Sequence, residues 1–198
     1  MAGPSPSLSE RPERANAPQR ILRAAARCIG EVGALRVSLQ EIAGTARVSK
    51  GLIHYHFADK ETLLARLVEW LTQGVVARER SAVAGATAQT VIDRLWTWLA
   101  AELERGDLRV LVELAHVRDE PVRAAVRIAA ATRRRAAEAT IHDVFAALEL
   151  RPRIPVPLLA DVVVIFVEGL AVDAAVNPEK EQRVAFDVFW LSMLSLVE

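Results

Sequence analysis

Side chains that can contact phosphates and base edges gather in one short stretch of this chain. Lysine ammonium groups pair with phosphate oxygens, and hydroxyl, imidazole and phenol groups can hydrogen-bond to phosphates or bases. Gly51 stands among them, and because a glycine inside a short helix costs roughly 1 kcal/mol relative to alanine, close approach to another molecule explains it better than flexibility. The chemistry predicted is contact with double-stranded DNA, through Ser38, Ser49, Lys50, Gly51, Leu52, His54, Tyr55, His56 and Lys60.

Two short helices joined by a tight turn are predicted to carry these residues. Ser38 followed by Glu41 has the spacing of a capping box, which indicates a helix from Leu39 to about Thr45. Ser49 can cap a second short helix that carries the residues from 50 to 56. The pair forms a helix-turn-helix, whose second helix enters the major groove of DNA.

The hydrophobic spacing in this segment separates an inside from an outside. The apolar set that can fill a compact three-helix unit is Ile42, Ala43, Ala46, Val48, Ile53 and Phe57. Lys50, Tyr55 and His56 belong to the outward set, and Lys60 starts the next helix, where its cation and the backbone amides favour a phosphate. The alternatives are that Tyr55 and His56 pack against neighbouring helices, that Lys50 is a solvated charge, and that Ser49 is only a cap.

Residues 38–64, SLQEIAGTARVSKGLIHYHFADKETLL, closely resemble the N-terminal DNA-binding segment of the TetR family of transcriptional regulators. The resemblance covers about 45 residues and includes Ile42-Ala43, Ala46, Val48-Ser49, Gly51, His56-Phe57, Lys60 and Leu63. The chain departs from the family pattern at His54-Tyr55, where tyrosine more often comes first, and at Arg47. The family usually has glycine at that turn position, and a left-handed backbone conformation is strained for any other residue.

The rest of the chain is predicted to be helical, so the fold class is all-α. Helices are expected near 18–32, from 59 to about 80, and near 87–105, 107–117, 120–148, 156–175 and 180–197, separated by Gly and Pro. The predicted organisation is a disordered arm at 1–16, a helix-turn-helix domain at 17–62 and a ligand-binding and dimerisation domain at 63–198.

Charge and composition agree with this division. Of 25 basic and 25 acidic residues, the first 60 positions hold nine basic and five acidic ones, so the N-terminal third is the better phosphate-facing part. The single cysteine, Cys28, falls on an apolar helix face and is expected to be a core residue. No apolar run reaches the ~18 residues of a membrane span, which predicts a cytoplasmic protein without a membrane partner. The scarcity of lysine among the basic residues hints at a bacterial source.

The resemblance implies a homodimer held by the last two helices. Both are too apolar for a helix with one wet face, which agrees with burial against a partner copy. The residues expected at the interface are Leu159, Val163, Phe166, Leu170, Phe186, Phe189, Trp190 and Leu194. The alternative is a helix pair that is internal to a monomer.

The resemblance also implies a small-molecule effector bound between the middle helices. The candidate ligand contacts are Trp70, Trp96, Trp98, His116 and Phe145, although such a side chain is more often a core residue than a ligand contact. Asp161 and Glu168 are seven residues apart on one face of an apolar helix, where a buried carboxylate needs a partner. Arg134 or Arg135, an interface contact or a cationic ligand could supply it.

The sequence offers no basis for an enzyme. It has no phosphate-binding loop after a strand and no nucleophile elbow, and we expect no catalytic residue, metal or cofactor. His54 and His56 point to different faces of a helix and make a poor metal pair. The function predicted is a ligand-responsive repressor that a small molecule releases from operator DNA. The alternative is a helical ligand-binding or scaffold protein whose helix-turn-helix does not bind DNA.

Overall fold

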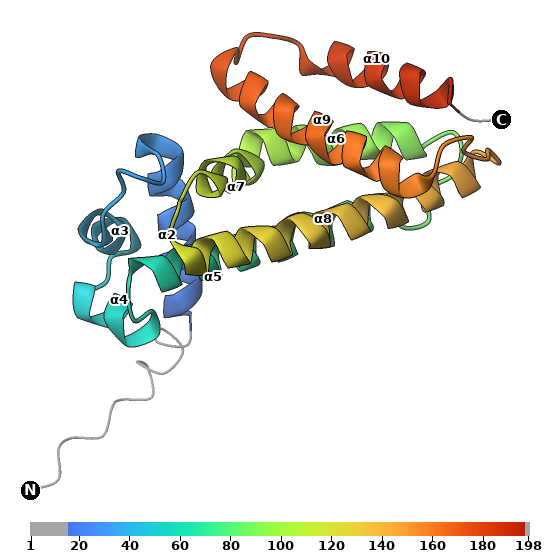
Figure 1. The fold of residues 1–198 in the computed structure, drawn as a ribbon. Coiled ribbons are helices and arrows are strands. Elements are labelled where there is room, and N and C mark those ends of the chain that lie inside the picture. The colour runs from blue at the N-terminus through green and yellow to red at the C-terminus, as the bar shows by residue number, and fades with distance from the viewer. Residues whose placement is uncertain (1–15, 197–198) are drawn as a thin grey trace, which may run out of the picture.

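A computed structural model describes residues 16–196, and within this range the chain forms nine α-helices and no β-strand (Figure 1). The predicted all-α class is confirmed. The predicted arm lies outside the described residues, apart from Asn16. The helices are α2 (Ala17–Val32), α3 (Leu39–Ala46), α4 (Lys50–His56), α5 (Lys60–Val83), α6 (Val91–Arg105), α7 (Asp107–Ala115), α8 (Glu120–Ala147), α9 (Val156–Val176) and α10 (Gln182–Leu194).

Side-chain caps fix where α3, α4 and α5 begin. The capping box at α3 is complete: Glu41 N donates to Ser38 Oγ at 3.2 Å, and Ser38 N donates to Glu41 Oε2 at 2.7 Å. At α4, Ser49 Oγ accepts a hydrogen bond from Leu52 N at 3.1 Å. Asp59 caps α5 in the same way, through a backbone N–H three residues further on at 2.7 Å. These bonds satisfy backbone donors that would otherwise lack a partner at each helix start.

The turn between α3 and α4 is left-handed at Arg47. Its φ of 52° and ψ of 50° place a non-glycine residue in the conformation that glycine adopts most easily. Arg20 of α2 secures this turn, because its Nη2 donates to the carbonyl oxygen of Ala46 at 2.9 Å. The helix-turn-helix is therefore tied to the first helix by a side-chain contact as well as by its core.

The core of the small lobe follows the predicted pattern. Ile42, Ala43, Ala46, Ile53 and Phe57 are buried, whereas Val48 is half-buried. Cys28 is buried as expected, and its sulfur lies 3.2 Å from the hydroxyl oxygen of Thr45.

Helix α5 runs through both parts of the molecule. It starts beside α4 and continues alongside α8, while α9 and then α10 lie over the other side of the larger lobe (Figure 1). The predicted helix ends lie within three residues of those in the structure, except at α6. This helix begins at Val91, because Thr87 to Thr90 form a turn closed by Thr87 N donating to Thr90 Oγ1 at 3.0 Å. Of the helices between residues 16 and 196, none is both long and apolar enough to cross a membrane.

Candidate functional site

Helix α4 presents a polar face to solvent. Ser49, Lys50 and Gly51 at its start are exposed, and Tyr55 leaves 81% of its surface open although it is a large aromatic residue. Leu52 is half-buried and Ile53 completely buried, so the helix is anchored on one side only. An exposed tyrosine and an exposed lysine on one short anchored helix form a suitable arrangement for contacts to DNA.

The space around Gly51 supports an external reason for this glycine. A Cβ atom at this position would meet only Ser49 Oγ, at 3.8 Å, which is an ordinary van der Waals separation. Its φ is not positive either. Because nothing within the described part of the chain requires glycine here, close approach of another molecule to α4 is the better explanation.

The remaining predicted DNA contacts lie at the ends of the helices. Ser38 is exposed at the start of α3, and its hydroxyl takes part in the capping box. Lys60 is half-buried at the start of α5. His54 is exposed, and because a carbonyl oxygen only accepts, His54 Nδ1 must donate the 3.0 Å bond to Ala58 O. Hydrogen bonds donated by Thr62 lower the pKa of Asp59, so the cap of α5 is an anion at neutral pH.

His56 corrects the expectation that it faces outward with Tyr55. Its ring is half-buried, and Nε2 is buried without a hydrogen-bond partner among residues 16–196. The ring meets Phe57 edge-on at 6.4 Å and borders a groove formed with Pro18 and Trp70. A residue one position after Tyr55 is rotated by about 100° around the helix axis, which turns it towards α2 and α5.

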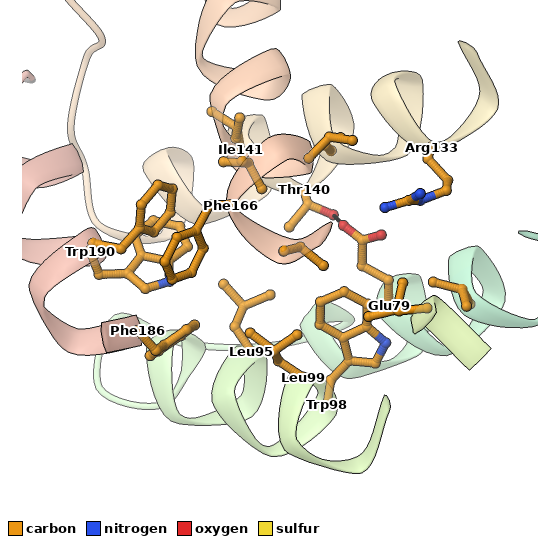
Figure 2. Close-up of a pocket in the computed structure, with 17 residues that line it drawn as sticks. Glu79, Leu95, Trp98, Leu99, Arg133, Thr140, Ile141, Phe166, Phe186 and Trp190 are labelled. Carbon is orange, nitrogen blue, oxygen red and sulfur yellow. Dashed lines mark hydrogen bonds between the residues drawn. The ribbon is translucent and has the colours of Figure 1, made fainter. Parts of the chain in front are cut away.

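The larger lobe contains an apolar cavity of about 50 Å³ between α5, α6, α7, α8, α9 and α10 (Figure 2). Most of its wall is aliphatic and aromatic, and Glu79, Arg133 and Thr140 are its only charged or hydroxyl-bearing lining residues. The full lining is Val75, Glu79, Leu95, Trp98, Leu99, Leu108, Arg133, Ala137, Thr140, Ile141, Val163, Val164, Phe166, Val167, Phe186, Phe189 and Trp190.

Of the aromatic and histidine residues predicted to contact a ligand, Trp98 alone lines this cavity. Trp70 borders grooves next to α2, and Trp96 packs against Phe186 with ring centroids 5.3 Å apart. Phe145 is a buried core residue, and His116 is exposed at the end of α7. Helical spacing identifies which side chains turn inward but does not distinguish the wall of a cavity from closed core.

Asp161 and Glu168 are half-exposed and outside the lining of the cavity, and their partners come from within the subunit. Their side chains are 46% and 40% exposed, and each pairs with an arginine of α8. Arg134 contacts Asp161 at 3.4 Å, as the sequence suggested, but the partner of Glu168 is Arg133, at 2.7 Å. Helix α9 packs against α8, so the acidic residues of α9 lie close enough to pair with the arginines of α8.

The polar end of the cavity was missed by the sequence analysis. Glu79 of α5 is 8% exposed and accepts a hydrogen bond from Thr140 Oγ1 of α8 at 2.8 Å. Burial raises the pKa of the Glu79 carboxyl, and the hydrogen bond from Thr140 and the charge of Arg133 offset this effect. The only sequence signal for a buried Glu79 was its spacing, which places this carboxylate on the same helix face as Leu71 and Val75.

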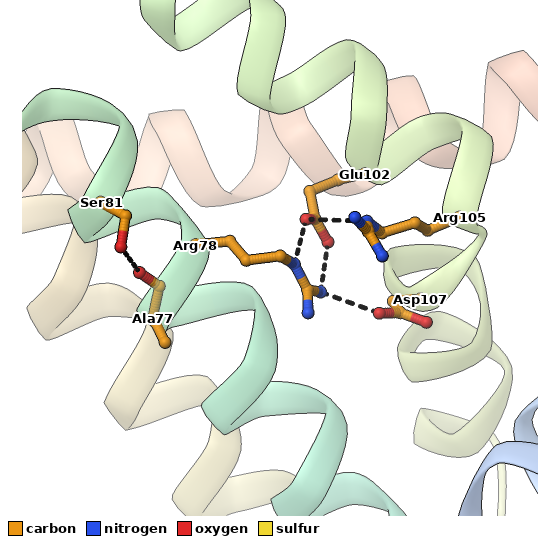
Figure 3. A network of polar contacts seen from close by, with 6 residues as sticks. All are labelled: Ala77, Arg78, Ser81, Glu102, Arg105 and Asp107. Carbon is orange, nitrogen blue, oxygen red and sulfur yellow. Dashed lines mark hydrogen bonds and ion pairs between the residues drawn. The ribbon is translucent and has the colours of Figure 1, made fainter.

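A second buried acid lies behind the cavity. Glu102 of α6 is 1% exposed and accepts from Arg78 Nη2 at 2.7 Å, and the same nitrogen donates to Asp107 of α7 at 2.8 Å (Figure 3). The hydrogen bond to Glu102 raises the pKa of Arg78. Arg105 approaches the same carboxylate at 3.9 Å. One ionic network therefore joins α5, α6 and α7.

Helix α7 continues this connection to the small lobe. Arg109 of α7 donates a hydrogen bond from Nη2 to the carbonyl oxygen of Gly30 in α2. Side chains of α7 thus contact α5 through Asp107 and α2 through Arg109, two residues apart.

Half of the predicted dimer residues are internal to the subunit. Leu159, Leu170, Phe186 and Trp190 are buried, and Val163, Phe166, Phe189 and Leu194 are half-buried. In the described residues, α9 and α10 expose a different apolar set. Its members are Leu158, Val162, Ile165, Val172, Val176, Val184, Val188 and Leu191. The sequence predicted that α9 and α10 carry more apolar residues than one subunit buries. It did not predict which residues of these helices are exposed.

Residues 21–67 match the family model described as bacterial regulatory proteins, tetR family. A curated relative, the HTH-type transcriptional regulator BetI of Rhizobium meliloti, is 41% identical over 66 residues, which are 33% of this chain and 31% of BetI. The chain thus spans about a third of the length of the curated relative it matches. Neither match is to an enzyme.

Solved structures extend the likeness over nearly the whole fold. A TetR-family regulator from Rhodococcus sp. superposes with a TM-score of 0.74 at 21% identity and covers 92% of this chain and 98% of its own. FadR from Bacillus subtilis, in complex with stearoyl-CoA, gives 0.69 at 20% identity over 89% and 96%. Reduced NemR from E. coli gives 0.72 at 16% identity over 92% and 98%. The resemblance to the TetR family is confirmed for residues 21–67, which match the family model, and the chain shares its fold with these crystallised regulators over 89–92% of its length.

Proposed function

We propose that this protein is a ligand-responsive transcriptional regulator that binds double-stranded operator DNA as a homodimer in the bacterial cytoplasm. Residues 17–62 act as the DNA-binding domain, and residues 63–198 bind the effector and dimerise. The observation that carries the proposal is the exposed face of α4, where Lys50, Gly51 and Tyr55 stand free on an anchored helix. The family match over the same residues supports it.

The dimer places two copies of α4 at a fixed separation. We assign the dimer contact to the exposed apolar residues of α9 and α10, because eight large apolar side chains exposed on two helices are costly in water. A dimer with twofold symmetry reads two half-sites that lie one turn of DNA, about 34–36 Å, apart.

Helix α5 couples the cavity to the DNA-binding surface. Val75 and Glu79 of α5 line the cavity, and the same helix begins at Lys60 beside α4. A ligand that displaces α5 changes the separation of the two α4 helices and lowers DNA affinity, so the protein acts as a repressor that its effector releases. That FadR was crystallised with stearoyl-CoA supports a small-molecule ligand in this fold.

Fluorescence anisotropy with DNA from upstream of the protein's own gene tests the DNA assignment. Lys60→Ala should weaken binding to every sequence and reduce the salt dependence, because Lys60 lies where a phosphate is expected. Lys50→Ala should also change sequence preference. Equal losses on specific and random DNA for both variants would contradict these separate roles, and no binding by the wild type would favour a scaffold protein instead.

Light scattering tests the dimer. Ile165 of α9 and Ile128 of α8 are similarly exposed, at 68% and 65%. Ile165→Glu should convert a micromolar dimer into a monomer, whereas the matched control Ile128→Glu should leave it a dimer. A monomeric wild type, or dissociation by the control alone, would refute this interface.

A further inference from the structure

We infer that the cavity of the larger lobe binds an apolar organic cation, with Glu79 as its counter-ion and aromatic side chains around its body. The inference rests on the proposed function in one respect, namely that the ligand of this cavity is taken to be the effector. Figure 2 shows Glu79, Thr140 and Arg133 at one end of the cavity and Phe166, Phe186 and Trp190 at the other. The site therefore suits a molecule with one polar end and one apolar end.

Within the described residues, Glu79 is the charged lining group that has no ion-pair partner. Among the described residues, the hydrogen bond from Thr140 is the only one that its carboxyl accepts. A carboxylate with four acceptor positions and 8% exposure is expensive to keep ionised. Burial also raises the pKa of this carboxyl, because too few groups stabilise its charged form. A cationic nitrogen in the cavity would provide the missing donors and the missing charge.

Arg133 does not offer an equivalent site for an anion. Its Nη1 donates to Glu168 at 2.7 Å, so its charge is already balanced from outside the cavity. Glu79 is then the unbalanced charge of the three groups. An anionic ligand would add a second negative charge to an apolar site, whereas a cation would make the site neutral.

The aromatic wall is a second, independent indication. The chain has four Trp, one Tyr and five Phe, and half of these ten residues line this one cavity: Trp98, Phe166, Phe186, Phe189 and Trp190. Phe166 and Phe189 are stacked at 4.0 Å with their planes 5° apart. Aromatic faces attract cations electrostatically, and they also pack against a flat apolar body.

The volume indicates that the observed cavity is a closed form. About 50 Å³ is well below the roughly 300 Å³ or more of an occupied ligand site. A ligand of about a dozen heavy atoms must therefore separate the helices that carry the wall. Because Glu79 lies on α5, this separation of the helices also moves α5, and α5 begins beside α4.

Isothermal titration of the full chain with three matched probes tests the inference at neutral pH. The probes are 2-naphthylmethylammonium, 2-naphthylmethanol and 2-naphthoate, which share one apolar body and differ in charge. The ammonium should bind about tenfold or more tightly than the alcohol, and the carboxylate should bind weakest. Tightest binding by the alcohol or the carboxylate, or no binding of the ammonium, would overturn the proposal.

Two variants locate the effect. Glu79→Gln keeps the shape and an acceptor for Thr140 but removes the charge, so the preference for the ammonium should disappear while alcohol binding stays. Glu69→Gln, on the same helix but paired with Arg66 at the surface, should bind as the wild type does. An unchanged preference in Glu79→Gln would exclude Glu79 as the counter-ion. Anisotropy of labelled DNA is measured in parallel with the same preparations. If the protein prefers the ammonium but does not bind DNA, the proposed regulatory function is refuted and the inferred ligand class is not.

Discussion

The two lobes are built on different principles. Among the described residues, every buried residue before Thr72 is apolar, and the buried polar or charged ones all lie between Thr72 and Thr140. The small lobe is closed by an apolar core and side-chain caps. The larger lobe places carboxylates and an arginine inside, where each needs a partner on another helix. A lobe held by such pairs can change its arrangement when a ligand alters one of them.

The ionic network should be the strongest single test of this contrast. Glu102→Ala leaves the Arg78 guanidinium without its principal partner and should lower the free energy of unfolding by about 3–5 kcal/mol. Urea denaturation followed by circular dichroism measures the loss. Glu104→Ala, an exposed position on the same helix, should change it by less than about 0.5 kcal/mol. Similar small effects for both variants would show that the larger lobe does not depend on its buried charges.

A smaller effect should follow from removing a cap in the small lobe. Ser38→Ala breaks the capping box of α3 and should cost about 1 kcal/mol in the same urea experiment. Gln40→Ala, an exposed change within α3, is its control. If Ser38→Ala were neutral, the caps would not be what defines this lobe.

The pH dependence of stability in the Glu79→Gln variant tests the same contrast between the lobes. Burial raises the pKa of the Glu79 carboxyl in the folded protein. The folded state then holds its proton more tightly than the unfolded state, so the carboxyl stabilises the fold at low pH and this contribution is lost as pH rises through the folded pKa. The variant should therefore gain stability relative to the wild type as pH rises from about 4, near the usual pKa of a glutamate, towards neutrality. A constant difference across this range would mean that Glu79 does not carry the raised pKa.

The same contrast decides what could be predicted from the sequence. The caps at Ser38, Ser49 and Asp59 are local signals, and the spacing of Ile42, Ile53 and Phe57 identified the core of the small lobe correctly. Glu79 and Arg133 resemble surface residues of charged helices, and only the packing of α5 against α8 shows that they face inward. Likewise, α9 is apolar on nearly all sides, so its sequence did not reveal which side faces Trp190 and which faces solvent.

Selection of genomic DNA fragments by the purified full chain tests the central claim most directly. The account predicts enrichment of a few sites, each with two inverted half-sites about 10–10.5 base pairs apart or a multiple of this spacing, and loss of that enrichment in Lys50→Ala. Recovery of fragments in proportion to their abundance, with no shared sequence in the wild type, would contradict it.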